Sequence, residues 1–418
     1  MSTVHIHIGQ CGNQMSIPLW KNYSNSCDKG AEHLFKSMDG WQRSIHIDSE
    51  SKVIYSLPKT FKVREKNIIV GKRGRGTNFA LGYTGMTSQG DDHLMEESME
   101  AVRKETERCD MYSGCVVYHS LSGGTGSGLG SHLIELMRDS YPCSNILSCA
   151  VAPCASGESP LQNYNALLGL HWLQSYSDSI ILLPNDYYIN HLNHLLQAGE
   201  SSNLEMHGQL SFQDVNKTIA NNLSGVFLPT NSLSTAKGLS LGQEPWELIR
   251  TLTPMPSTKF ITLTQHTSKK LSWEGLTSKI LQYNPKFDSN GEPTRALSAT
   301  VVARGDADNT FLSTMKTTQE RKIKRGLNFV DWNPYPIDYW RAKANTIGSK
   351  ESRSLTLAIN STGFLDHVQT ILSRALIKLE SRAYVHWYYR HGISEEIFQE
   401  SVETLGRILN EYHMMTKT

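Results

Sequence analysis

"LSGGTGSGLGSHL", residues 121–133, decides the fold, because five glycines fall within eight positions directly after an apolar run. Glycine loses more backbone freedom on folding than any other residue, so this density needs a compensating use. A helix start presents unpaired backbone N–H groups, and glycine lets anionic oxygens approach them closely. The stretch therefore predicts a strand–loop–helix unit that binds phosphate. A glycine-rich turn that only serves tight packing is the alternative.

Neither familiar nucleotide-binding pattern fits this stretch. A Walker A loop needs GxxxxGK followed by Ser or Thr, and no lysine follows these glycines. A dinucleotide fingerprint needs GxGxxG, but counting from Gly124 ends on Leu129 and counting from Gly126 ends on Ser131. A second stretch, "GKRGRGTNFALG" (71–82), adds three cations to a similar composition. It suits anionic oxygens, with a solvated basic turn as the alternative.

The first half of the chain alternates apolar segments with amphipathic ones. The expected strands are "VHIHI" (4–8), "SIHID" (44–48), "CVVYHSL" (115–121), "NILSCAVAP" (145–153) and "DSIILLP" (178–184). Helical periodicity fills 93–109 and 130–141 between them. This alternation predicts an α/β fold with a mostly parallel sheet covered by helices. Farther along, strands at 259–265 and 298–305 mix with helices, and the last part of the chain, from a Ser/Thr cap at "STGF", reads as purely helical.

Composition restricts the function classes. The 418 residues carry a net charge of +1, so no bulk field favours nucleic acid or a membrane surface. No stretch has the length and apolarity of a membrane helix, and the N-terminus does not resemble a signal peptide. Seven cysteines without a CxxC pair argue against a disulfide framework and a structural zinc site. We expect a cytoplasmic protein with reduced thiols and neither a nucleic-acid nor a membrane partner.

Two motifs together resemble the paired signature of the tubulin superfamily: "GQCGNQ" (9–14) and "SGGTGSG" (122–128). The resemblance extends along most of the chain through "IDSESKVI" (47–54), "RGTNFALGY" (75–83), "NYNALLGL" (163–170), "FQDVN" (212–216), "TPMP" (253–256) and "RAYVHWYYRHGISEEIF" (382–398). Within the superfamily, "ESMEAVRKETERCD" and "QNYN" are most similar to delta-tubulins, with zeta-tubulins second.

The resemblance implies a tubulin-like fold in three domains. A Rossmann-like parallel-sheet GTPase domain is expected over 1–206, an α+β intermediate domain over 207–365, and a C-terminal helical hairpin over 366–418. It also implies GTP or GDP as ligand, with Mg²⁺. By motif, the phosphates are expected against Gly76, Thr77, Asn78, Gly123, Gly124, Thr125, Gly126 and Ser127, with Gln10 and Cys11 beneath the phosphates and sugar.

The resemblance assigns the remaining nucleotide contacts as well. Asp48 and Glu50 are expected to face the magnesium ion, since a hard cation prefers carboxylate oxygens; without the family they read as a solvated pair. Glu158 is expected at the ribose. Asn185 and Asn216 are expected to read the guanine edge, because an amide offers both a donor and an acceptor. Phe212 is expected to stack on the base. Without the resemblance, Phe212 reads as a core helix residue and Asn216 as a surface one.

In tubulins an acidic residue of the next subunit helps to activate the water that attacks GTP. Counting back from "LTPMP" gives Glu247 as the matching position. A carboxylate near a γ-phosphate orients water or takes its proton. The resemblance thus makes Glu247 a catalytic candidate that acts on a longitudinal neighbour. An exposed helix glutamate without a catalytic role is the alternative.

Several features bear on partners and location. The expected partners are other tubulins, either alpha and beta or a second divergent tubulin, through longitudinal contact. Thr77 and Phe79 replace the asparagine and tryptophan usual in the third loop, and the segment between Gln14 and Asp48 is shorter than in microtubule-forming tubulins. The end "YHMMTKT" is not acidic, so partners that read acidic tails are not expected. Delta- and zeta-tubulins imply a cytoskeletal place at centrioles, centrosomes or basal bodies.

Two other functions remain open from the sequence. One is a self-assembling filament GTPase of the bacterial or phage type. The other is a dinucleotide-dependent metabolic enzyme, which lacks its GxGxxG element here. A metal hydrolase is weaker still, because His5 and His7 alternate on a strand without HExxH or a cysteine–histidine cluster. We expect these two histidines to be ordinary strand residues.

Overall fold

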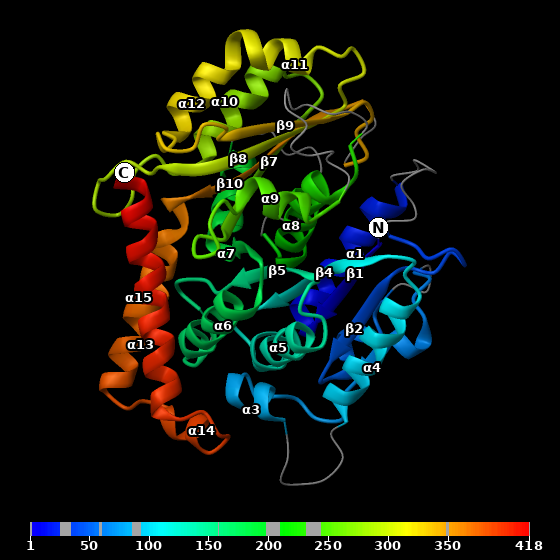
Figure 1. The fold of residues 1–418 in the computed structure, drawn as a ribbon, viewed down its shortest axis with the longest axis vertical. Coiled ribbons are helices and arrows are strands. Elements are labelled where there is room, and N and C mark those ends of the chain that lie inside the picture. Colours follow the sequence, from blue (N-terminus) through cyan, green and yellow to red (C-terminus); the bar gives the residue numbers. More distant parts are fainter. Residues whose placement is uncertain are drawn as a thin grey trace. The chain divides into compact units, whose positions relative to one another are not determined.

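The computed structural model describes residues 2–25, 35–57, 61–85, 93–157, 159–197, 210–230, 244–347 and 351–417 (Figure 1). The chain forms two compact units. The first contains 1–17, 28–216 and 367–408, and the second contains 18–27, 217–366 and 409–418. Both units are built from stretches that are distant in sequence. The division into three domains stays a prediction.

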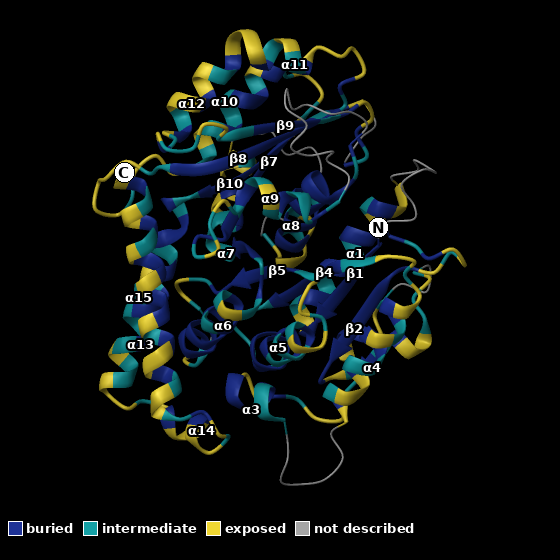
Figure 2. Ribbon diagram, in the orientation of Figure 1, coloured by how far each residue is buried: buried dark blue, intermediate teal, exposed yellow. Residues whose placement is uncertain are grey.

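The first unit is built on six parallel strands in the order β3–β2–β1–β4–β5–β6. The strands are β1 Ser2–Ile8, β2 Ser44–Asp48, β3 Ile68–Val70, β4 Tyr112–Ser120, β5 Asn145–Ala152 and β6 Ser179–Pro184. Ile6 of β1 pairs with Ile45 on one side and Val117 on the other. These strands are almost wholly buried, as Figure 2 shows, which explains their near-continuous apolar sequences. The predicted α/β fold with a parallel sheet is confirmed.

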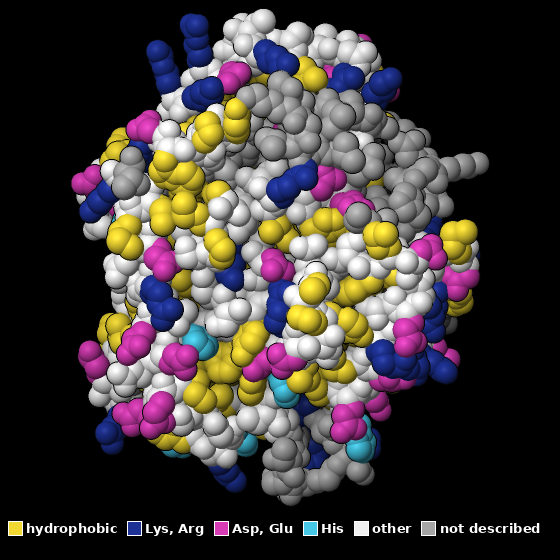
Figure 3. All heavy atoms as spheres, viewed as in Figure 1, with side chains coloured by type: hydrophobic (Ala, Val, Ile, Leu, Met, Phe, Trp, Pro, Cys, Tyr) yellow, Lys and Arg dark blue, Asp and Glu magenta, His cyan; other side chains and the backbone are white. Residues whose placement is uncertain are grey.

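Helices follow each of these strands or connect them. They are α1 Gly9–Asn25, α2 Ser51–Ile54, α3 Phe79–Thr84, α4 Leu94–Glu107, α5 Gly130–Ser140, α6 Gln162–Tyr176, α7 Asn185–Gln197 and α8 Phe212–Phe227. α6 is buried along most of its length, so its sequence lacks a polar stripe. The outer face of α4 instead carries alternating charges, with Arg103 paired to Glu100 and Glu107 (Figure 3).

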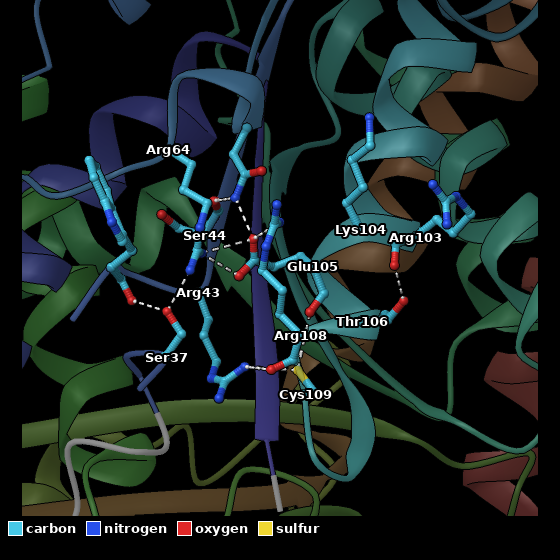
Figure 4. A network of polar contacts seen from close by, with 12 residues as sticks. Ser37, Arg43, Ser44, Arg64, Arg103, Lys104, Glu105, Thr106, Arg108 and Cys109 are labelled. Carbon is cyan, nitrogen blue, oxygen red and sulfur yellow. Dashed lines mark hydrogen bonds and ion pairs between the residues drawn. The ribbon is translucent and has the colours of Figure 1, made fainter. Parts of the chain in front are cut away.

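A charged cluster closes the amino-terminal edge of this sheet. The Glu105 carboxylate, at the end of α4, is fully buried and accepts from Arg64 Nη1 at 2.8 Å, Arg108 Nη1 at 3.2 Å and Asn67 Nδ2 at 2.8 Å. Figure 4 shows Arg64 and Arg108 beside Glu105. Arg43, just before β2, donates to Cys109 Sγ at 3.0 Å beside them. The cluster thereby joins the chain ahead of β2, β3 and β4.

Four buried histidines lie on the strands of the first unit. His7 stacks on His46 at 4.9 Å and on Tyr118 at 4.6 Å between ring centroids, and His5 Nδ1 lies 2.9 Å from the Tyr118 hydroxyl. Burial lowers the pKa of His5 and of His46 to about 3 and that of His119 to about 4, so these rings are neutral. Within the described ranges, no group of three or more His, Cys, Asp or Glu side chains is arranged to hold a metal.

The second unit contains a mixed sheet in the order β7–β10–β8–β9. The strands are β7 Phe260–Ser268, β8 Ala296–Arg304, β9 Ile337–Ala342 and β10 Arg353–Ser361. β10 runs antiparallel to β7 and β8, while β8 and β9 are parallel. In the described part of this unit, the helices include most of α8 together with α9 Glu247–Leu252, α10 Trp273–Tyr283, α11 Phe311–Thr314 and α12 Glu320–Leu327. Trp273, Phe311 and Leu357 belong to the apolar core of this unit.

The C-terminal part consists of α13 Leu365–Glu380, α14 Val385–Tyr389 and α15 Glu395–Lys417. The expected helical C-terminal part is confirmed, and turns separate its three helices. Arg382 and Tyr384 adopt left-handed φ values of 51° and 61°, and Gly392 has a φ of 85°, so the chain turns twice. The expected cap is present, because the Ser361 side chain accepts from Gly363 N. None of the helices in the described part of the chain is both long and apolar enough to cross a membrane.

Candidate functional site

The carboxyl-terminal edge of the parallel sheet gathers most residues predicted to contact a ligand. Parallel strands all end at this edge, and open α/β sheets bind ligands there. Gln10 and Cys11 follow β1, and Asp48 and Glu50 come at the end of β2. The other predicted residues that follow strands of this sheet are Gly76, Thr77 and Asn78 after β3, Gly123 to Ser127 after β4, and Asn185 after β6.

The glycine loop after β4 enters α5 through a π-helical turn, Thr125–Leu129. A methyl group added at Gly124 would lie 2.7 Å from the carbonyl oxygens of Arg75 and Asn78, and one at Gly128 would lie 2.1 Å from Phe79 O. At Gly123, by contrast, the same methyl group would meet nothing within 4 Å. Close packing therefore requires Gly124 and Gly128, while the space beside Gly123 is open.

The third loop, after β3, is strained at its tip. Gly76 and Thr77 have left-handed φ values of 54° and 55°, and both are exposed. A β-branched residue is unfavourable in this region, and such strain collects at functional sites. The buried Asn78 follows as the cap of α3, with its Oδ1 accepting from Ala80 N at 2.8 Å. The loop tip is thus fixed on one side by a helix cap while its strained residues face solvent.

The first and second loops both contact the glycine loop. The Ser49 hydroxyl lies 2.6 Å from that of Thr125, and a methyl group at Gly9 would lie 3.1 Å from Gly126 N. Gln10 is exposed beside this contact. Burial raises the pKa of the neighbouring Cys11 thiol to about 12, so Cys11 is a neutral contact and not a nucleophile.

Asp48 and Glu50 suit a hard cation. Asp48 is buried, and burial, together with the charge of Glu50, raises the pKa of its carboxyl to about 6 in spite of hydrogen bonds from the Ser49 and Glu50 amides. A cation placed beside the two carboxylates would offset both the burial and the repulsion. Mg²⁺ commonly takes one or two carboxylates and completes its shell with phosphate oxygens and water. The donor set fits Mg²⁺ held together with phosphates.

Sequence reasoning assigned no chemistry to two residues that support the loops. Asn165 of α6 donates to the carbonyl oxygens of Thr77 and Ser122, both at 2.8 Å. His119 of β4 donates from Nδ1 to Gly126 O at 2.8 Å, with Nε2 2.8 Å from the Ser148 hydroxyl. A lone asparagine in the apolar run "YNALLGL" was the available signal for the first. His119 gave none, because its partners lie 7 and 29 positions away and match no local pattern.

The residues predicted at the base and ribose lie apart from the glycine loop in sequence. Phe212, at the start of α8, has 55% of its surface exposed, which leaves its ring available for stacking. Asn216, one turn later, is buried and donates to Gln14 Oε1 at 3.3 Å. Asn185 begins α7 and is half-buried. Glu158 lies outside the described residues.

Glu247 belongs to the second unit. It is the first residue of α9, is half-buried, and accepts through Oε1 from Glu244 N at 3.2 Å. A carboxylate at the start of a helix interacts favourably with the positive end of the helix dipole. Its assignment to hydrolysis stays a prediction.

A cavity of about 470 Å³ opens beside the loop after β5 in the first unit. Arg374 and Lys378 of α13 line it and donate to the carbonyl oxygens of Ala155 and Pro160. The described residues that line it do not include the predicted phosphate or base contacts. The edge loops, not this cavity, therefore form the candidate site.

Residues 2–193 match the Tubulin/FtsZ family GTPase domain, and this range contains all six parallel strands with the loops described above. The fold and the matched range show that residues 2–193 form a domain of the Tubulin/FtsZ family.

Similarity to individual tubulins runs the length of the chain. This chain is 29% identical to the tubulin delta chain of Canis lupus familiaris over 471 residues. It is 27% identical to the tubulin delta chain of Homo sapiens over 473 residues, and each alignment covers 99% of both chains. It is 26% identical to the tubulin beta-1 chain of Colletotrichum graminicola over 439 residues, covering 98% of this chain and 94% of that one. The expected similarity to delta-tubulins is confirmed.

Proposed function

We propose that this protein is a guanine nucleotide-binding subunit of the tubulin cytoskeleton, with its nucleotide at the carboxyl-terminal edge of the first unit's sheet. The observation that carries the proposal is the glycine loop. Its packed glycines fix the backbone, and Gly123 borders open space beside a helix start. The match of residues 2–193 to a GTPase domain supports guanine nucleotide as the ligand.

Each loop has a distinct task in this proposal. Backbone N–H groups of 123–127 bind phosphate oxygens, which glycine allows at close range. Asp48 and Glu50 would hold Mg²⁺, directly or through its waters, and the ion would supply positive charge that neutralises the phosphates. Phe212 stacks on the base, and Asn185 and Asn216 discriminate guanine through hydrogen bonds. Glu158 is assigned to the ribose by family resemblance alone.

The nucleotide released from the purified protein tests this proposal. The protein is purified in its folded state and then denatured, and we expect chromatography of the released material to detect GDP or GTP. Titration is expected to show binding of GTP and GDP, with weak or no binding of ATP. Binding of NAD or NADP without GTP or GDP would overturn the tubulin-type site and restore the metabolic-enzyme alternative.

We further propose that Glu247 activates hydrolysis on a longitudinally associated tubulin subunit. A carboxylate orients the attacking water or accepts its proton. Replacing Glu247 with Ala or Gln is expected to lower assembly-stimulated GTP turnover by about 100-fold, a typical effect of losing a general base. Affinity for GTP should not change, because Glu247 acts in trans. Glu292→Ala, an exposed carboxylate elsewhere in the second unit, is the matched control. Undiminished turnover in the Glu247→Ala protein would remove this role.

The proposed cellular role is structural: a component of the doublet or triplet microtubules of centrioles and basal bodies, joined to alpha- and beta-tubulin or to a second divergent tubulin. Full-length similarity to delta chains supports it. A tagged copy is expected to colocalise with centrioles. Long filaments formed by the purified protein alone with GTP would favour the bacterial-type filament instead.

A further inference from the structure

Asn165 uses every hydrogen-bonding position of its side chain. Its Nδ2 donates to Thr77 O and Ser122 O, both at 2.8 Å, and its Oδ1 accepts from Phe79 N at 2.9 Å and from the Tyr388 hydroxyl at 2.7 Å. An amide offers two donors and one oxygen with two lone pairs. The fully buried Asn165 is therefore saturated, so a change in one partner disturbs the others.

The partners of Asn165 come from three separate parts of the first unit. Thr77 is the strained tip of the third loop, and Ser122 begins the glycine loop. Both loops are held through their carbonyl oxygens, which fixes the direction of the neighbouring N–H groups. One side chain thus sets the relative position of the two loops proposed to hold the nucleotide phosphates.

Tyr388 adds the C-terminal segment to this arrangement. It is buried on α14, its hydroxyl also lies 3.4 Å from Leu161 O, and burial raises the pKa of its phenol, so it remains a donor. On the same short helix, Trp387 and Tyr389 are 46% and 44% exposed. α14 also packs beside α3 (Figure 1), and a methyl group added at Gly392, three residues after α14, would lie 3.5 Å from Thr84. One helix therefore reaches both the protein surface and the buried Asn165.

We infer that Asn165 and Tyr388 are positioning residues that couple α14 to the glycine loop and the third loop, so that nucleotide binding and the conformation of residues 384–391 are linked. The inference rests on the proposed function, because it concerns affinity at the same site. Linkage is reciprocal. If bound nucleotide changes the affinity of a partner for the α14 surface, that partner changes the affinity for nucleotide by the same factor.

A pair of near-isosteric variants separates coupling from stability. Tyr388→Phe removes only the hydroxyl that contacts Asn165. Tyr164→Phe is the matched control, because the Tyr164 hydroxyl donates to Ala383 O at 3.0 Å and so holds the same segment without contacting the loops. Both rings are buried and pack on each other at 5.4 Å between centroids, so both variants keep their shape.

GTP affinity by titration and hydrogen exchange of residues 384–391 give the two readouts. In the wild type, GTP is expected to slow exchange in this segment. Tyr388→Phe is expected to weaken GTP binding roughly fivefold, the effect of losing one hydrogen bond, and to abolish the GTP-dependent slowing. Tyr164→Phe should lower thermal stability by about as much as Tyr388→Phe does. It should keep full GTP affinity and the GTP-dependent slowing of exchange.

Two results would overturn the coupling while leaving the proposed function standing. One is GTP binding by the wild type without any change in exchange at 384–391, an outcome that requires no variant. The other is equal GTP affinity in the Tyr388→Phe and Tyr164→Phe proteins. Failure of the wild type to bind GTP would overturn the proposed function and the coupling together.

Discussion

The two edges of the first unit's parallel sheet differ in how their polar groups are used. At the amino-terminal edge, the buried Glu105 carboxylate is enclosed by Arg64, Arg108 and Asn67, so charge is neutralised within the protein. At the carboxyl-terminal edge, backbone N–H groups, hydroxyls and the amide of Asn165 prevail, and burial raises the pKa of the Asp48 carboxyl.

The difference teaches where stability and where ligand chemistry reside. A closed charge cluster has little left to offer a ligand, whereas loops with oriented N–H groups and a carboxylate of raised pKa favour phosphate and a cation. Acid disturbs both edges at once, loss of Glu105 disturbs the amino-terminal edge, and substitution of the loop glycines disturbs the carboxyl-terminal edge.

Acid should disturb both edges together. Burial lowers the pKa of His5, His7, His46 and His119, so between the unfolded value of 6.5 and about 4 the unfolded chain binds protons that the folded chain does not. The contribution of these histidines to the free energy of unfolding is therefore fully present above pH 6.5. It falls as the pH drops below 6.5, by up to about 1.4 kcal/mol per pH unit for each histidine. Denaturant titrations between pH 7.5 and 4.5 measure the slope.

Asp48 acts in the opposite direction over part of this range. Its pKa is raised from 3.8 to about 6, so the folded chain keeps a proton that the unfolded chain has released, and this contribution weakens as pH rises toward 6. Because one carboxyl is set against four imidazoles, the free energy of unfolding should still fall as the pH is lowered. A free energy of unfolding that stayed constant from pH 7.5 to 4.5 would contradict the neutral, buried state of the histidines.

Glu105→Ala should break the amino-terminal edge selectively. It removes the buried carboxylate from Arg64, whose side chain is only 12% exposed and which keeps its ion pair with the exposed Asp39 at 2.7 Å. Removing one partner of a buried ion pair typically costs about 3–5 kcal/mol of folding free energy, and the remaining Arg64–Asp39 pair puts the expected cost at the lower end of that range. GTP affinity of the folded protein should not change. Glu100→Ala, which removes the exposed ion pairs of Glu100 with Arg103 and Lys104 on the same helix, is the control and should change stability little. Equal effects of the two variants would show that burial of Glu105 is not decisive.

Gly124→Ala and Gly123→Ala should separate the packing role of the carboxyl-terminal edge from its nucleotide-binding role. At Gly124 the methyl group meets the Arg75 and Asn78 backbone, and overpacking of this kind costs about 1–3 kcal/mol of stability. At Gly123 the methyl group has space, so stability should hold while GTP affinity drops roughly tenfold or more, because charge-assisted hydrogen bonds to phosphate are displaced. Thermal melts and titrations distinguish the two. Unchanged GTP affinity in Gly123→Ala would place the phosphates elsewhere.

Much of the fold was predictable because burial on both faces leaves continuous apolar runs. The five expected strands of the first half correspond to β1, β2, β4, β5 and β6. β3, Ile68–Val70, is too short for periodicity to reveal. The breaks around α14 were missed because Arg382 and Tyr384 are not turn-forming residues, and only their tertiary setting holds them at positive φ.

The candidate site was predictable in its segments but not in its internal support. Glycine density identified the loop after β4, yet spacing could not tell that Gly124 is required for packing and Gly123 is not. The hydrogen bonds of Asn165 join residues 86, 88, 43 and 223 positions away in sequence. Contacts of that range are set by the tertiary fold, so no local pattern encodes them.

A crystal structure of the protein grown with GTP and Mg²⁺ tests the central claim most directly. We predict triphosphate density against the backbone of residues 123–127, the metal facing Asp48 and Glu50, and the base against the ring of Phe212. Nucleotide bound away from the carboxyl-terminal edge of the parallel sheet, or no nucleotide at saturating concentration, would contradict the account.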